Sequence, residues 1–171
     1  MKPATITLAV FTFALFACSG KQVKEDVYFF DYEQAAGWST IQLESGFAKS
    51  GKYCEKITPD KVYSNTFILS LAEAGKQPRK KIKASIWITA PEMQQDVQLV
   101  IDMFSPTESR SIKNTYLLIP AASLQGKGDW VQFKTELDIA DITDGSILAK
   151  VFIWNPGGQK CFLDDFQISF E

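Results

Sequence analysis

Two adjacent carboxylates, Asp164 and Asp165, interrupt the apolar segment CFLDDFQISF near the end of the chain. Strand side chains alternate between the two faces of a sheet, so a strand here would place Asp164 in line with Phe162, Phe166 and Ile168. Asp165 would lie on the other face. A carboxylate among core-facing aromatic rings is costly to bury alone. Asp164 therefore requires a partner, which could be a cation, a lysine or the N–H groups of a turn.

The composition excludes several classes of function. The chain has no histidine, which removes the usual general base, the Ser-His and Cys-His nucleophile systems and imidazole zinc sites. A glycosidase needs only two carboxylates, and Asp102 with Glu108 or Glu136 could supply them, but no spacing points to such a pair. The net charge of −2 is weak and unclustered apart from residues 79–83. We therefore expect neither an enzyme nor a nucleic-acid partner.

Tryptophans on polar strand faces indicate a binding role instead. Segments 82–89, 97–104 and 148–154 each alternate between an apolar face and a face with polar or aromatic side chains, and Trp87 and Trp154 lie on the second kind of face. Sugar rings stack on aromatic rings while neighbouring polar groups bind their hydroxyls. Packing of both tryptophans in or around the core is the alternative. The expected glycan site consists of Ser85, Trp87, Gln98, Asp102, Trp154 and Asn155.

The first residues predict export and lipidation. An uncharged, mostly apolar run at 6–17 is too short to span the ~30 Å core of a bilayer and fits a cleaved signal peptide. The segment LFACSG that ends this run resembles the bacterial lipobox, in which the cysteine is lipidated. We expect a signal peptide at 1–17, a lipidated Cys18 and a polar tether within 18–26. An ordinary secretory signal is the alternative.

Besides the cysteine that we expect to be lipidated, the chain has two others, Cys54 and Cys161. An exported chain with two further cysteines predicts a disulfide, and closing so long a loop would add up to about 4.7 kcal/mol in the chain-entropy model. The alternative is two buried thiols that pack as small apolar side chains.

Period-2 alternation dominates the rest of the chain, with Gly, Pro, Asn and Asp between short apolar segments. The expected strands are residues 27–32, 41–43, 53–58, 65–71, 82–89, 97–104, 116–120, 131–137, 148–154 and 162–170. Short helical turns are expected near 72–75, 121–124 and 141–144. So many short strands in one domain, residues 27–171, predict an all-β fold, a jelly-roll β-sandwich of two antiparallel sheets.

The order of six short motifs resembles a known family. They are FDYE at 30–33, GW at 37–38, SGKY at 50–53, ASIWI at 84–88, GDWVQF at 128–133 and FLDDFQI at 162–168. Together they resemble the carbohydrate-binding-module or galactose-binding-like jelly rolls of Bacteroidetes-type lipoproteins. The resemblance covers residues 27–171. It implies a non-catalytic domain whose partner is a glycan or polysaccharide.

The resemblance also implies a structural calcium ion. The matching ligands are Glu33 and either Asp164 or Asp165, with backbone carbonyls from the turn at 50–52. A cation there would offset the free-energy cost of burying Asp164 among core-facing aromatic side chains.

The expected protein is thus a lipoprotein of the bacterial cell envelope, anchored to the outer membrane and facing the periplasm or the exterior. A structural or assembly component that binds envelope proteins is the alternative, because one fold hosts many functions. A protein-binding role would show a larger, flat apolar patch.

Overall fold

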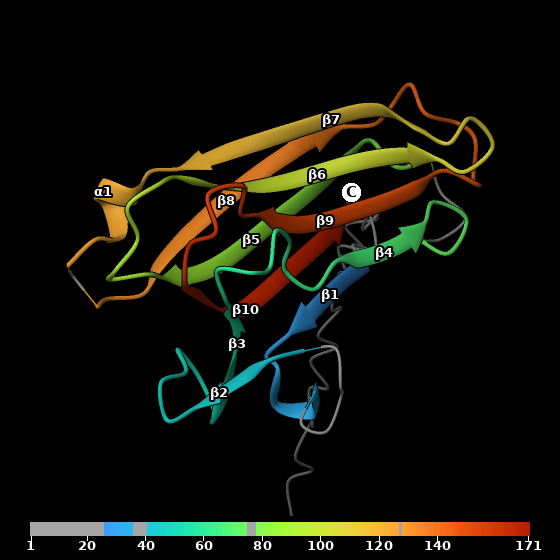
Figure 1. Cartoon of the computed structure of the whole chain (residues 1–171). Coiled ribbons are helices and arrows are strands. Elements are labelled where there is room, and N and C mark those ends of the chain that lie inside the picture. Colours follow the sequence, from blue (N-terminus) through green and yellow to red (C-terminus); the bar gives the residue numbers. More distant parts are fainter. Residues whose placement is uncertain (1–25, 36–40, 75–77, 127) are drawn as a thin grey trace, which may run out of the picture.

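The computed structural model describes residues 26–35, 41–74, 78–126 and 128–171. The predicted signal peptide and Cys18 lie outside these residues, as does nearly all of the tether. Strands in two antiparallel sheets make up most of the described chain, and the sheets pack face to face as a β-sandwich (Figure 1). No helix within these ranges is long and apolar enough to cross a membrane.

Sheet A has the strand order β2-β3-β10-β5-β8, and β1 pairs with the same edge of β10 beyond the end of β3. Sheet B has the order β4-β9-β6-β7. The strands of sheet A are β1 (Asp26–Phe30), β2 (Leu43–Ser45), β3 (Tyr53–Ile57), β5 (Lys81–Thr89), β8 (Val131–Asp138) and β10 (Cys161–Phe170). The strands of sheet B are β4 (Phe67–Ser70), β6 (Val97–Ser105), β7 (Arg110–Ile119) and β9 (Leu148–Trp154).

Each predicted strand has a counterpart in the structure, and the helical turn expected at 121–124 is the short helix α1 (Ala121–Leu124). A 3-10 turn, η1 (Glu33–Ala35), was not expected. The largest difference is at β7, which begins at Arg110 rather than at 116. Its first residues are polar and mostly exposed, yet their backbone pairs with the end of β6. Pairing between backbones does not require alternating apolar side chains, so the hydrophobic pattern of the sequence did not predict the first half of β7.

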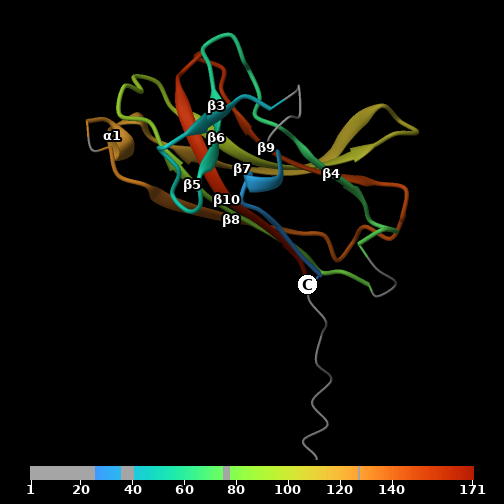
Figure 2. The same ribbon diagram turned by 90° about the horizontal axis from the view of Figure 1, so that it is seen from below.

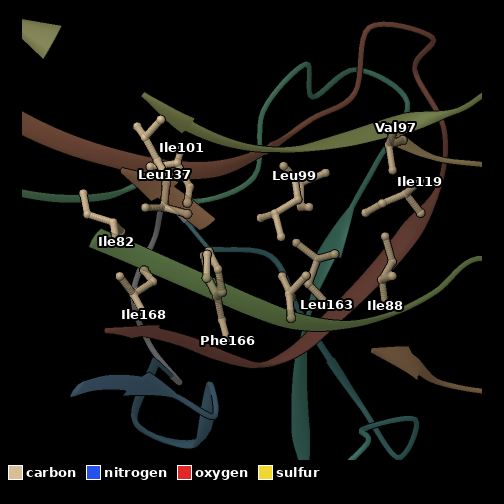
Figure 3. Close-up of a cluster of buried hydrophobic side chains, with 14 of the residues drawn as sticks. Ile82, Ile88, Val97, Leu99, Ile101, Ile119, Leu137, Leu163, Phe166 and Ile168 are labelled. Atoms are coloured by element: carbon tan, nitrogen blue, oxygen red, sulfur yellow. The ribbon is translucent and has the colours of Figure 1, made fainter. Parts of the chain in front are cut away.

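The core lies between the two sheets and consists of the inward side chains of alternating strand positions. On β5, Ile82, Ala84, Ile86 and Ile88 are buried, whereas the residues that alternate with them, Lys83, Ser85 and Trp87, are only partly covered. Figure 3 shows Leu99 and Ile101 of β6 facing this row across the sandwich. Burying one such side chain stabilises the fold by about 1.5–3 kcal/mol, and the long central strands supply most of them.

A bulge in β10 corrects the predicted alternation of its side chains. Asp164 pairs with Trp87, but Gln167 pairs with Ser85, so β10 has one residue more than β5 between these pairs. Asp165 is the extra residue and has a positive φ of 48°. After the bulge Phe166 faces the core, whereas Asp164 lies on the outer face of sheet A. The prediction that Asp164 shares a face with Phe166 is therefore wrong.

Candidate functional site

The six residues of the predicted site do not come together on one surface. Ser85 and Trp87 lie on the outer face of sheet A, whereas Gln98, Asp102 and Trp154 lie on the outer face of sheet B. These two faces point in opposite directions from the core. Alternation along a strand separates inward from outward positions, but it does not say which sheet a strand joins.

Trp87 is covered by the loop that connects β2 to β3. Lys49 of this loop places its ammonium group 4.5 Å from the centre of the Trp87 ring. Phe47, on the same loop, packs against Phe162 with 4.9 Å between ring centres, and against Trp130 at 6.1 Å. β2 and β3 form the edge of sheet A next to β10, and Figure 2 shows them beside β10 and β5. A ring that stacks with a lysine is not a free platform for a sugar.

Asn155, at the end of β9, is completely buried and structural. Its side-chain amide donates to the carbonyl oxygens of Lys61 and Gln159, at 3.0 and 2.9 Å. Its side-chain oxygen accepts from the Gln159 N–H at 2.7 Å. These three bonds hold the turn before β10, and they occupy the groups that a ligand would use.

The outer face of sheet B carries exposed aromatic side chains, and we call it the aromatic face. Trp154 of β9 lies opposite Gln98 of β6, and Phe152 of β9 lies opposite Val100. On the far side of β6, Val100 pairs with Tyr116 of β7. Tyr116 is 64% exposed and Trp154 36% exposed. Neighbouring strands are about 4.8 Å apart, so Phe152 and Tyr116 stand roughly 10 Å apart across β6.

Tyr63 extends the aromatic face beyond β9. It forms an isolated bridge with Trp154, its ring is 5.5 Å from that of Phe152, and its side chain is 53% exposed. Neither Tyr63 nor Tyr116 belongs to the predicted site. The alternation of Tyr116 with Leu118 was the signal that could have found Tyr116, whereas Tyr63 precedes β4 in a segment without periodicity.

The polar groups of the aromatic face lie along β6 and β9. Asp102 pairs across the strands with Lys150 and accepts a hydrogen bond from the Ser111 hydroxyl. The Lys150 ammonium group lies 3.4 Å from the centre of the Phe104 ring. Donors and acceptors therefore stand next to the aromatic rings, which is the arrangement that recognises a ring carrying hydroxyl groups.

A second cluster surrounds the loop from Gly46 to Tyr53, where the predicted calcium ligands meet. Glu33 Oε1 accepts hydrogen bonds from the backbone N–H groups of Lys52 and Tyr53, at 2.6 and 2.7 Å. These bonds, that of Tyr53 first, lower the pKa of Glu33. Gly51 has a φ of 62°, and a Cβ there would lie 2.4 Å from Glu33 Oε1, so only glycine fits.

Asp164, on β10, also contacts this loop. Its Oδ2 atom accepts from the N–H groups of Lys49 and Ser50, at 2.8 and 3.1 Å, and Oδ1 accepts from the Asp165 N–H at 2.8 Å. Burial raises the pKa of Asp164 and outweighs these three bonds, which lower it. Asp165 Oδ1 accepts from the Ser50 hydroxyl at 2.7 Å. N–H groups are thus the partners that the buried aspartate requires.

This donor set does not resemble a calcium cage. Calcium takes six to eight oxygen ligands, whereas the groups that point at Glu33 and Asp164 are N–H donors. No three acidic, histidine or cysteine side chains converge as a metal site in the described ranges. The geometry therefore satisfies both carboxylates by hydrogen bonding, and calcium binding stays a prediction.

The predicted disulfide between Cys54 and Cys161 is wrong, because both cysteines are free and buried. Cys161 pairs with Ile57 on β3, three positions from Cys54, and an odd separation along a strand means opposite faces of the sheet. Cys54 Sγ donates instead to the carbonyl oxygens of Glu44 and Phe47, at 3.9 Å each. Burial raises the pKa of both thiols to about 12.

Glu55 is an acidic side chain inside the sandwich. It lies on the inner face of β3, opposite Leu163, and is completely buried. Oε1 accepts from the Asn65 N–H at 2.7 Å, but Oε2 has no hydrogen-bond partner among the described residues. Burial raises the pKa of Glu55, and burial followed by the Glu55 charge raises that of Tyr32. No sequence signal distinguished Glu55 from an outward-facing residue.

Comparison with solved structures identifies the fold. The CBM22-2 xylan-binding domain of Paenibacillus barcinonensis Xyn10C matches 84% of this chain and 99% of its own, with a TM-score of 0.57 and 15% identity. The CBM22-1 domain of the same enzyme matches 76% of this chain and 80% of its own, with a TM-score of 0.51 and 14% identity. The chain shares the β-sandwich fold of carbohydrate-binding modules.

A third match has the same fold within a larger enzyme. The CBM22-1–GH10 modules of Clostridium thermocellum endo-1,4-β-D-xylanase 10B, complexed with xylohexaose, align with 85% of this chain and 25% of theirs, with a TM-score of 0.54 and 8% identity. No family model matches the sequence, and no curated protein does. At these identities the likeness describes the fold alone.

Proposed function

We propose that this protein is a non-catalytic glycan-binding module and that the aromatic face of sheet B holds the polysaccharide. The observation that carries the proposal is the group of exposed rings, Tyr63, Trp154 and Tyr116, on the outer side of sheet B in a fold shared with carbohydrate-binding modules. Exposed aromatic side chains gathered on one sheet face mark an interaction surface.

The exposed rings would bind a sugar chain that crosses the strands obliquely. Trp154 and Tyr116 lie on opposite sides of β6, one register row apart, and would stack on successive parts of the chain, while Gln98, which pairs with Trp154, would bind hydroxyl groups. Asp102 and Lys150 offer an acceptor and a donor one row further along β6 and β9. None of these groups needs to transfer a proton, so the site binds without catalysis.

The cellular setting is part of the same proposal. The lipobox-like segment before Cys18 supports a lipid-anchored envelope protein, most simply at the outer membrane, which would hold a glycan near a partner enzyme or transporter. An envelope-assembly role remains the second candidate function. It predicts that the exposed rings bind a protein surface and that no glycan binds at all.

Truncation of Trp154 tests the proposal. Aromatic anchors commonly contribute 2 kcal/mol or more to binding, so Trp154→Ala should weaken the affinity for xylohexaose, measured by calorimetry, at least about thirtyfold. The variant should still fold, as its melting temperature will show, because the Trp154 side chain lies on the outer face and not in the core. Phe47→Ala is the matched control, since it truncates a comparably exposed ring over the opposite sheet. It should leave the affinity unchanged.

The envelope-assembly alternative predicts other results. Wild-type protein would retain no xylan, cellulose or mannan fragment, or it would retain one with an affinity that Trp154→Ala leaves unchanged. Either finding would remove the glycan site from the aromatic face.

The calcium prediction is tested separately, because the N–H donors around Glu33 and Asp164 do not resemble a calcium cage. An ion held by Glu33 and Asp164 or Asp165 at a hundred times its dissociation constant would add about 2.7 kcal/mol to stability. EDTA should then lower the melting temperature and added calcium restore it. A melting temperature that responds to neither would leave the N–H groups of the 49–53 loop as the complete explanation for the buried aspartate.

A further inference from the structure

One cavity lies away from the aromatic face, at the side of the sandwich where β1 and β4 run near each other (Figure 1). We call it the edge pocket. It has a volume of about 670 Å³, within the range of small-ligand sites. Phe29, Phe30 and Gln34 form one wall, and Asn65, Phe67 and Ile68 form the other.

The edge pocket combines aromatic walls with unused polar groups. Phe29 and Phe30 are 55% and 41% exposed, and the Phe30 ring packs 5.8 Å from that of Phe67. Gln34 and Asn65 also line the pocket, and within the described ranges neither side-chain amide makes a hydrogen bond. Exposed aromatic rings beside amides can bind a sugar ring by stacking and hydrogen bonding. An acyl chain cannot form hydrogen bonds with the amides.

The edge pocket continues into a shallow hollow over the start of β4. This hollow has a volume of about 550 Å³ and shares Asn65, Thr66 and Ile68 with the edge pocket. Its far wall includes Tyr63, whose ring contacts Phe152 on the aromatic face. Contiguous side chains thus lead from the outer face of sheet B, around the start of β4, into the edge pocket.

We infer that a glycan chain bound on the aromatic face continues past Tyr63 and places its end or a branch in the edge pocket. The inference rests on the proposed function and adds a second subsite to it. From β7 to β4 the chain crosses three strand spacings, roughly 14 Å. A short oligosaccharide can cover the aromatic face alone, whereas only a longer one can also reach Gln34 and Asn65.

The dependence of affinity on chain length tests the inference. Wild-type protein should bind xylohexaose at least tenfold more tightly than xylotriose in calorimetric titrations. In the double variant Gln34→Ala/Asn65→Ala this ratio should fall at least fivefold. Neither side chain is buried and the Asn65 N–H that donates to Glu55 remains, so the variant should fold, as its melting temperature will show. Gln167→Ala, an exposed amide on the outer face of sheet A, is the matched control and should keep the ratio.

The failures can be told apart. Equal affinities for the two oligosaccharides, or a ratio that the double variant does not change, would overturn the extended site while Trp154-dependent binding still supports the aromatic face. Loss of all xylohexaose binding in the wild type would overturn both proposals. Competition between dodecanoate and xylohexaose that depends on Phe30 but not on the two amides would assign the edge pocket to an apolar ligand instead.

Discussion

At the scale of single residues, the carboxylates show how much a buried charge depends on backbone donors. Asp164 is completely covered, and three N–H groups point at its two oxygens. Glu33 receives two more from the same loop. The two side chains thus tie a loop without regular structure to η1 and β10, and this loop in turn covers Trp87.

Removing the Asp164 carboxylate should therefore loosen the loop. We expect Asp164→Ala to lower the free energy of unfolding in urea by about 2–3 kcal/mol, because buried N–H groups lose a charged acceptor. Asp165→Asn is the control, since asparagine tolerates the positive φ and keeps an oxygen for Ser50. It should change stability by less than about 0.5 kcal/mol. Equal effects of the two variants would contradict this role for Asp164.

Glu55 makes the stability of the fold depend on pH. Its pKa in the folded state is raised above the unfolded value, so the unfolded state loses its proton first as the pH increases. The free energy of unfolding should consequently fall as the pH rises from the unfolded pKa, near 4.5, through the higher folded pKa.

Glu55→Gln should remove the contribution of Glu55 to this pH dependence, while Asp164, whose pKa is also raised, keeps its own. At pH 8 we expect the variant to be more stable than the wild type by about 1–3 kcal/mol, because an unpartnered buried carboxylate oxygen is no longer charged. Glu136→Gln provides the comparison: Glu136 is exposed and its bond to Lys81 lowers its pKa, so solvent screens the charge and the substitution should change the stability little. Urea unfolding at pH 5 and pH 8 measures both. Parallel pH profiles for wild type and Glu55→Gln would refute the assignment.

At the scale of elements, period-2 patterning predicted the strands well because one face of each strand packs against the same hydrophobic core. The pattern could not predict which strands pair in which sheet. Ser85 and Gln98 belong to strands with equally clear alternation, yet β5 and β6 lie in different sheets. The residues predicted to form one glycan site are therefore divided between two opposite faces of the sandwich. Likewise, the single extra residue at Asp165 reverses the relation between Asp164 and Phe166, and its only sequence signal is an Asp-Asp pair.

The register of β3 against β10 decides the state of the cysteines. Because Cys54 and Cys161 lie on opposite faces of sheet A, denatured but unreduced protein lacking Cys18 should titrate two thiols per chain. Ellman's reagent gives this count directly. A count near zero would mean that the two strands pair in a different register.

At the scale of the whole molecule, the two outer faces have different chemistry. Sheet A is covered at one end by the β2–β3 loop and is otherwise polar, with ion pairs such as Lys81–Glu136. Sheet B leaves Tyr116, Leu118 and Trp154 exposed. The sequence contained these residues, but only the fold shows that they share a surface. This asymmetry is the basis for our proposal that sheet B binds the glycan.

The most direct test of that assignment is to map the ligand by chemical-shift perturbation of backbone amides with xylohexaose. Our account predicts shifts concentrated on β6, β7 and β9 around Gln98, Tyr116 and Trp154, with little change on β5 or β8. Shifts confined to the outer face of sheet A would contradict it. So would the absence of any shift with xylohexaose, cellohexaose and mannohexaose.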